Sequence, residues 1–206
     1  MSRYYSSERL VQDLYTFCNN VVGKTTVVVG SSTASNLGES LTNYEVFSLS
    51  GGILGERKNK SLLGMINIFN SFPNITFLLS AGNNDVYERG FRRLQTRQFF
   101  KSLKKYLVRI EQKNVIFCSL FPRVKPFSRS KDRNRALSTA HILNKQIFQS
   151  LKNTKVRYLD LMPIFKFLGK KGLLSNCKDG KHYLLPKIKL LDVQNLSLKK
   201  VAVDRC

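Results

Sequence analysis

Five short apolar runs alternate with longer stretches of helical periodicity, and this alternation limits what the chain can fold into. The runs occupy 25–29, 44–49, 74–79, 114–120 and 155–161. Apolar residues at helical spacing fill the segments around them, at 7–19, 36–41, 61–69, 91–112, 137–151 and 186–201. Strands that alternate with helices in this way form parallel, right-handed βαβ units with helices on both faces of the sheet.

The size of the chain favours one domain. With 206 residues, 42% of them hydrophobic, it is long enough for one sizeable core and short for two. Residues 1–206 are therefore expected to form a single α/β domain, a flavodoxin-like three-layer α/β/α sandwich with a five-stranded parallel sheet. An N-terminal helix is expected within 1–20 and a basic C-terminal helix or tail over 192–206.

Two of the expected helices carry a clear apolar stripe. In the segment 91–112 the predicted buried side chains are Phe99, Leu103, Leu107 and Ile110, with the basic residues outside. In 137–151 they are Ile142, Leu143, Ile147 and Leu151.

The first apolar run is followed by Gly30 and then by two hydroxyl residues, Ser31 and Ser32. In an open α/β sheet, ligands bind beyond the carboxyl ends of the strands, so a serine at this position is well placed to react. The alternative is that Gly-Ser-Ser only forms a turn and has no role in catalysis. This run alone does not decide between the two interpretations.

Three further short motifs fall at the same edge of the predicted sheet. The second run ends in Ser50-Gly51-Gly52 and the third in Gly82-Asn83-Asn84-Asp85, and Asp179 stands three residues before His182 after the fifth run. In this order, the four motifs resemble the SGNH (GDSL-like) hydrolase family of esterases and lipases, which has a flavodoxin-like sandwich. The resemblance extends from 25 to about 191.

The resemblance implies a role for each motif. Ser32 would be the nucleophile, with its own backbone, Gly51 and Asn84 forming the oxyanion hole, and Asp179 and His182 would complete the triad. Gly51 is preferred to Gly52 because Ser50-Gly51 matches the family's second motif better. The sequence departs from the family at Ser31, where an Asp is common, although the triad does not use that residue. Similar domains occur in proteins encoded by some LINE-type retroelements, so a viral or retroelement origin is one interpretation.

Elementary chemistry supports the same residues. A serine hydroxyl needs a neutral imidazole as base, itself oriented by a carboxylate. The chain has two histidines: His182 follows Asp179 in a polar loop, whereas His141 lies in an apolar-patterned helix, where a structural role is expected. Asn84 offers side-chain N–H groups to an oxyanion, and the alternative for it is an Asx turn at the end of the third run.

The charge balance points to anionic partners. The 35 Lys and Arg outnumber the 13 Asp and Glu and give a formal charge of +22, which bears on partners and solubility rather than on the fold. Nucleic acid or an anionic membrane surface would fit, and a solvated basic surface is the alternative. Basic residues concentrate in two segments, the predicted helix at 91–112 and the stretch after the fourth run. In the second segment, Phe121 and Phe127 lie among the basic residues as candidate stacking partners for the bases of single-stranded nucleic acid. The candidate contacts are Arg92, Arg93, Arg97, Lys101, Arg123 and Arg129.

Location and cofactors follow from what the sequence lacks. Arg3, Glu8, Arg9 and Asp13 interrupt the first twenty residues, and no segment is apolar for long enough to span a bilayer, so neither a secretory signal nor a transmembrane segment is expected. The four cysteines show no metal-ligand spacing, which favours free thiols, an intracellular (cytoplasmic or nuclear) protein, and no metal or cofactor.

Two functions from different classes remain. The first is a serine esterase that hydrolyses a small acyl ester, acetyl or short-chain, through an acyl-enzyme on Ser32. The second is an SGNH-fold protein with weak or no catalysis that binds nucleic acid or an anionic surface through its basic face.

Overall fold

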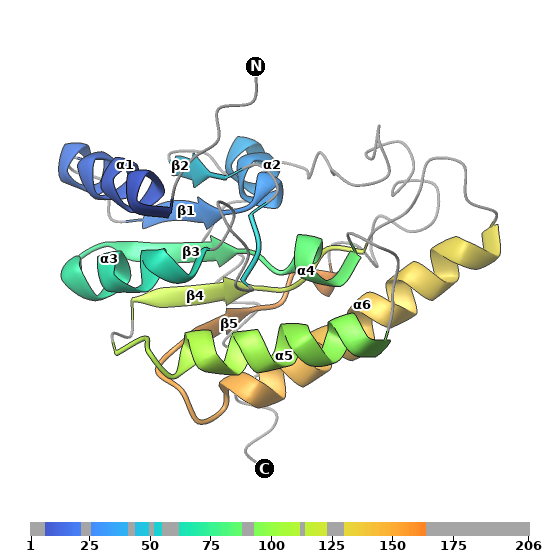
Figure 1. The fold of residues 1–206 in the computed structure, drawn as a ribbon. Coiled ribbons are helices and arrows are strands. Elements are labelled where there is room, and N and C mark those ends of the chain that lie inside the picture. Colours follow the sequence, from blue (N-terminus) through green and yellow to red (C-terminus); the bar gives the residue numbers. More distant parts are fainter. Residues whose placement is uncertain are drawn as a thin grey trace, which may run out of the picture.

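A five-stranded parallel sheet forms the centre of the computed structural model, which describes residues 7–21, 26–40, 44–49, 52–54, 62–87, 93–111, 114–122 and 130–163 (Figure 1). The strand order is β2-β1-β3-β4-β5, and every neighbouring pair is parallel. The strands are β1 (Thr26–Gly30), β2 (Glu45–Ser48), β3 (Thr76–Ser80), β4 (Val115–Cys118) and β5 (Arg157–Leu159). The predicted α/β fold with a five-stranded parallel sheet is confirmed.

Helices connect the strands in the order expected for βαβ units. They are α1 (Ser7–Asn20), α2 (Ser32–Ser40), the 3-10 turn η1 (Leu62–Gly64) with α3 (Met65–Ser71), α4 (Asn83–Tyr87), α5 (Arg93–Leu107) and α6 (Ser130–Leu151). Because a parallel pair needs a crossover between its strands, each helical segment carries the chain back to the start of the next strand.

Alternate residues of the central strands enter two separate apolar clusters, as they must when both faces of a sheet are covered. Val27, Val29 and Phe77 face the cluster that includes buried side chains of α1, α3 and α5. Val28 and Leu78 face the second cluster, which includes Leu37 of α2. The described residues thus show helices on both sides of the sheet, with the larger cluster on the side of α1, α3 and α5.

The apolar stripe of α5 is buried as predicted, since Phe99, Leu103 and Leu107 are each no more than 2% exposed, and Ile110 just beyond the helix is 4% exposed. On α6 the prediction is wrong at one position. Leu143, Ile147 and Leu151 are buried, but Ile142 is 57% exposed. A helix turns 100° per residue, so two consecutive residues cannot both lie at the centre of one buried face.

Several predicted boundaries shift. Helix α2 begins at Ser32 rather than at 36, because the Ser31 carbonyl already accepts a hydrogen bond from the Ala34 amide at 2.8 Å. Helix α6 begins at Ser130 rather than at 137, and α4 was not expected at all. The predicted helix at 186–201 and the tail at 192–206 lie outside the described residues.

Across the described ranges, we find no helix that combines the length and apolar character needed to cross a bilayer.

Candidate active site

The carboxyl ends of β1 and β3 meet at one edge of the sheet, and Gly30 makes their close approach possible. Its φ is +147°, and a Cβ at this position would lie 2.0 Å from the Ser80 carbonyl oxygen. Only glycine fits such a contact between two backbones. The chain then turns at Ser31, whose amide donates to the same Ser80 oxygen at 3.0 Å, and enters α2.

Ser32 is the first residue of α2, and its side chain is half-buried. Its neighbours are more enclosed, since Ser31 is 0% and Thr33 4% exposed. Of the three consecutive hydroxyl residues, Ser32 is therefore the one that solvent or a substrate reaches most readily. Its position at the amino end of a helix also places it near the positive end of the helix dipole, which favours developing negative charge.

The flanking hydroxyls are joined in a buried network with Ser80 at the end of β3. The Oγ of Ser31 lies 2.9 Å from the Oγ1 of Thr33, and the Ser80 hydroxyl donates to that Oγ1 at 3.0 Å. The sequence interpretation of Ser31 as the replacement for an Asp did not anticipate this network. Thr33 and Ser80 carry no sequence signal that would have identified them, because the hydrogen bond between their hydroxyls spans 47 residues and forms only when β1 and β3 pair.

Asn84 lies in α4, at the same edge of the sheet, and is half-buried. Its Nδ2 donates to the Gly52 carbonyl oxygen at 3.1 Å, so the amide contacts a loop 32 residues away in the chain. The Val86 amide, which an Asx turn at Asn84 would use, donates to the Gly82 carbonyl oxygen at 3.2 Å, so the described contacts show no such turn. The contact with Gly52 fixes the orientation of the side-chain amide.

Gly52 follows β2, and both of its backbone groups have partners. Its amide donates to the Leu49 carbonyl oxygen at 2.9 Å, while its own carbonyl accepts from Asn84. An amide that is used in this turn is a poor oxyanion donor. The predicted donor, Gly51, lies outside the described residues.

Two further side chains of α4 hold the loops around Asn84. Asn83 pairs with the backbone of Phe121 through both amide atoms, donating from Nδ2 at 2.9 Å and accepting at Oδ1 at 3.3 Å. Asp85 accepts from the Leu54 amide at 3.0 Å. Gly82 allows this short helix to pack closely, because its φ is +102° and a Cβ there would lie 2.8 Å from a ring carbon of Phe99. These contacts connect α4 to the segments that follow β2 and β4. Figure 1 shows α4 at the carboxyl end of β3.

The predicted acid and base, Asp179 and His182, lie outside the described residues, so the triad remains a prediction. His141 is described, and it lies on the exposed side of α6 rather than in the buried face where a structural role was expected. Within the described ranges, no group of three or more His, Cys, Asp or Glu side chains is arranged to hold a metal ion.

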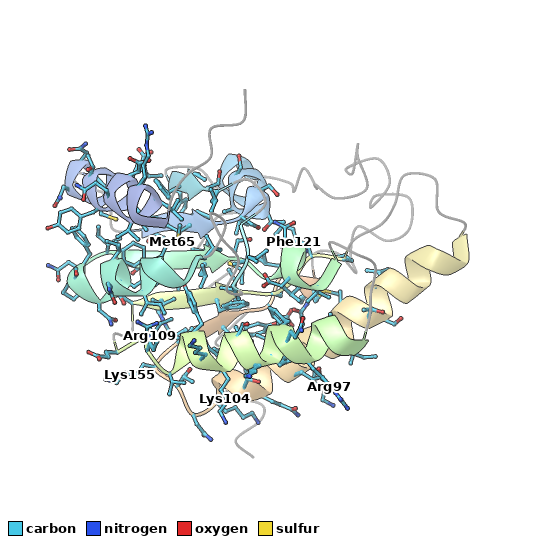
Figure 2. All side chains as sticks on the ribbon, in the orientation of Figure 1. Met65, Arg97, Lys104, Arg109, Phe121 and Lys155 are labelled. Carbon is cyan, nitrogen blue, oxygen red and sulfur yellow. The ribbon has the colours of Figure 1, made fainter. Side chains whose placement is uncertain are left out.

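The basic residues singled out from the sequence are only partly described. Arg97 and Lys101 are exposed on α5, and Arg93 is the first residue of that helix. Arg92, Arg123 and Arg129 lie outside the described residues. Phe121 contradicts its predicted role as a stacking partner, because it is 1% exposed and packs in the smaller apolar cluster (Figure 2).

Comparison with known proteins finds similar structures but no similar sequence. No family model and no curated protein matches the chain. Among solved structures, a GDSL-like lipase from Bacteroides thetaiotaomicron is 18% identical, with a TM-score of 0.51 and coverage of 97% of this chain and 98% of the lipase. The acetyl xylan esterase AlAXEase is 15% identical, with a TM-score of 0.50 and coverage of 86% and 98%. At these identities the likeness shows a shared fold.

Proposed function

We propose that the protein is an SGNH-type serine hydrolase that cleaves small acyl esters, acetyl or short-chain, through an acyl-enzyme on Ser32. The observation that carries the proposal is the position of Ser32. Ser32 is half-buried, follows the carboxyl end of β1 and is the first residue of α2. The two residues beside it, Ser31 and Thr33, are buried and their hydroxyl groups are hydrogen-bonded to each other. The proposal draws further support from the two solved structures that share the fold, a lipase and an esterase.

In the first half of the proposed reaction, the Ser32 Oγ attacks the ester carbonyl carbon while Nε2 of His182 accepts the hydroxyl proton. Asp179 orients the imidazole and stabilises its charged form. When the tetrahedral intermediate collapses, the bond to the alcohol oxygen breaks and the imidazolium protonates the leaving alcohol. The product of this half is an acyl group on Ser32.

In the second half, water attacks the acyl carbon and gives its proton to His182. The bond from carbon to Ser32 Oγ then breaks, Ser32 regains its proton, and the carboxylic acid leaves. Both tetrahedral intermediates carry an oxyanion, and we assign its stabilisation to hydrogen bonds from the Asn84 side chain and from the backbone amides of Ser32 and Gly51. The Asn84 amide nitrogen bears two hydrogens, of which one bonds to Gly52 and the other serves the oxyanion.

Turnover of p-nitrophenyl acetate tests this proposal. The wild-type protein should hydrolyse the ester, and Ser32→Ala and His182→Ala should each reduce the rate to background. Ser31→Ala is the matched control, because it removes the neighbouring hydroxyl and leaves the nucleophile. Equal turnover by the wild type and both triad variants would contradict the proposal.

The second candidate function is binding of a polyanion, and one observation favours it. The exposed side of α5 carries cations and no carboxylate. Helix α5 packs against a face of the sheet, whereas Ser32 lies at the carboxyl ends of the strands. Polyanion binding is therefore compatible with ester hydrolysis. The variant Ser32→Ala distinguishes them, since it should lose turnover and keep binding.

A further inference from the structure

The exposed side of α5 and the turn after it form a basic stripe, which we define as Arg97, Lys101, Lys104 and Arg109. All four side chains are exposed, while the opposite side of the helix is buried in the larger apolar cluster. Figure 2 shows Arg97, Lys104 and Arg109 spread along the length of the helix. Lys105 is a fifth exposed cation beside the stripe.

Within α5, the cations of the stripe lie on one side of the helix. Helix α5 contains no Asp or Glu over its 15 residues, so no carboxylate of its own offsets the cations. At 100° per residue, Arg97, Lys101 and Lys104 lie within about 60° of one another around the helix. Within the helix, from Arg97 to Lys104, this row extends about 10 Å at 1.5 Å per residue, and Arg109 lies beyond it in the turn after α5, two residues before the exposed Glu111. Arg97, Lys101 and Lys104 therefore form a straight row of cations along the helix.

A row of this length matches the phosphate backbone of a duplex. Each strand of double-stranded DNA carries one phosphate per roughly 3.4 Å of helix axis, so about 10 Å of a strand carries about three phosphates, one for each cation of the row. A single strand is gripped mainly by aromatic side chains that stack on its bases. On α5 and the adjoining 108–111, Phe99 and Tyr106 are buried and Phe100 is half-buried against the core.

The same face is poorly suited to insertion into a membrane. An interfacial helix buries an apolar side among the acyl chains. The apolar side of α5 already packs against the sheet, and among the described side chains of α5 and the turn after it, Val108, 72% exposed, is the one large exposed apolar residue. Charge therefore dominates over apolar contact on this face.

We propose that the exposed side of α5 binds the phosphate backbone of a nucleic-acid duplex, without reading its sequence. The cations of the stripe contact phosphates and release the counterions condensed on them. This binding is independent of the Ser32 reaction, so it stands even where the proposed esterase activity fails.

Fluorescence anisotropy with a DNA duplex of about 20 base pairs, well longer than the stripe, tests the proposal over about 50 to 200 mM salt. The triple variant Arg97→Gln, Lys101→Gln, Lys104→Gln removes three cations of the stripe. The matched control is Arg9→Gln, Lys145→Gln, Lys152→Gln, which removes three exposed cations from α1, α6 and the turn after α6. Both triples lower the formal charge of +22 by three.

The stripe variant should bind at least about tenfold more weakly at low salt, and its slope of log Kobs against log salt should be less negative by about 2.7, or 0.9 for each lost phosphate contact. The control triple should change the slope by less than about one. Ser32→Ala should bind as the wild type does.

Several results would overturn the proposal. One is an absence of duplex binding at low salt, and another is an equal change of slope in both triples. Single-stranded DNA of the same sequence bound more than about tenfold tighter than the duplex would show a stacking mode instead. If the protein binds vesicles containing phosphatidylserine through the stripe and does not bind the duplex, the partner is a membrane surface.

Discussion

Replacing Gly30 by alanine is expected to reduce the free energy of unfolding by about 2–6 kcal/mol. The backbone at this position has a φ of +147°, which costs a residue with a side chain about 1–3 kcal/mol. The added Cβ would also lie 2.0 Å from the carbonyl oxygen of Ser80. That atom belongs to a paired central strand, so the overlap adds about 1–3 kcal/mol because the strands must separate locally.

Urea denaturation followed by circular dichroism measures this loss. With an m-value of about 2 kcal/mol/M, the midpoint should fall by about 1–3 M. Gly64→Ala is the matched control: its φ of −62° suits alanine, and a Cβ there meets only a side-chain methyl of Val11, at 2.7 Å. We expect the control to change stability by less than about 1 kcal/mol, since the helical preference of alanine offsets the contact. A loss at Gly30 within 1 kcal/mol of that at Gly64 would refute the reasoning.

Three other predictions concern the active-site edge and the core. Asn84→Ala should lower kcat for p-nitrophenyl acetate by on the order of 10²–10³-fold and leave KM nearly unchanged, because its amide is assigned to the oxyanion; an unchanged kcat would exclude that role. Thr33→Val should cost about 1–3 kcal/mol in urea denaturation by leaving the Ser31 and Ser80 hydroxyls without their shared partner, whereas Thr33→Ser should retain the network. The free energy of unfolding should fall between pH 9 and pH 11, because burial raises the pKa of Cys18 to about 11 and raises the pKa of the Tyr106 hydroxyl, so the unfolded chain loses these protons first. Stability that stays constant over that range would contradict the burial of these groups.

The sequence predicts the sheet well because its signals are local. Val27, Val28 and Val29 are β-branched, lie next to a glycine and are fully buried on the two sides of β1. A run of this kind has few alternatives in an α/β chain. The apolar stripe of α5 is equally clear, since four side chains at helical spacing define one face.

Helix starts and side-chain partners are harder to predict. The early start of α2 depends on the Ser31 carbonyl, whose orientation is fixed by the Gly30 turn against Ser80. Phe121 looks like an exposed aromatic among basic residues, but the bidentate contact of its backbone with Asn83 draws it into the core. Both outcomes depend on contacts between residues about 40 or more apart, which local periodicity does not encode.

In the candidate site, too, the positions of residues along the chain can be predicted from the sequence, whereas their side-chain contacts cannot. The position of Ser32 after β1 follows from the sequence, and so does the presence of Asn84 at the same edge. The contact of Asn84 with Gly52 and the hydroxyl network beneath Ser32 become visible only when β1, β2 and β3 are assembled.

Covalent labelling of Ser32 tests the central claim most directly. A fluorophosphonate probe reacts when an activated serine oxygen attacks phosphorus and fluoride leaves, and mass spectrometry of the digested protein locates the modified residue. We expect one label, on Ser32 of the wild type, its loss in Ser32→Ala, and its retention in Ser31→Ala. Labelling at another residue, or equal labelling of the wild type and Ser32→Ala, would contradict that claim.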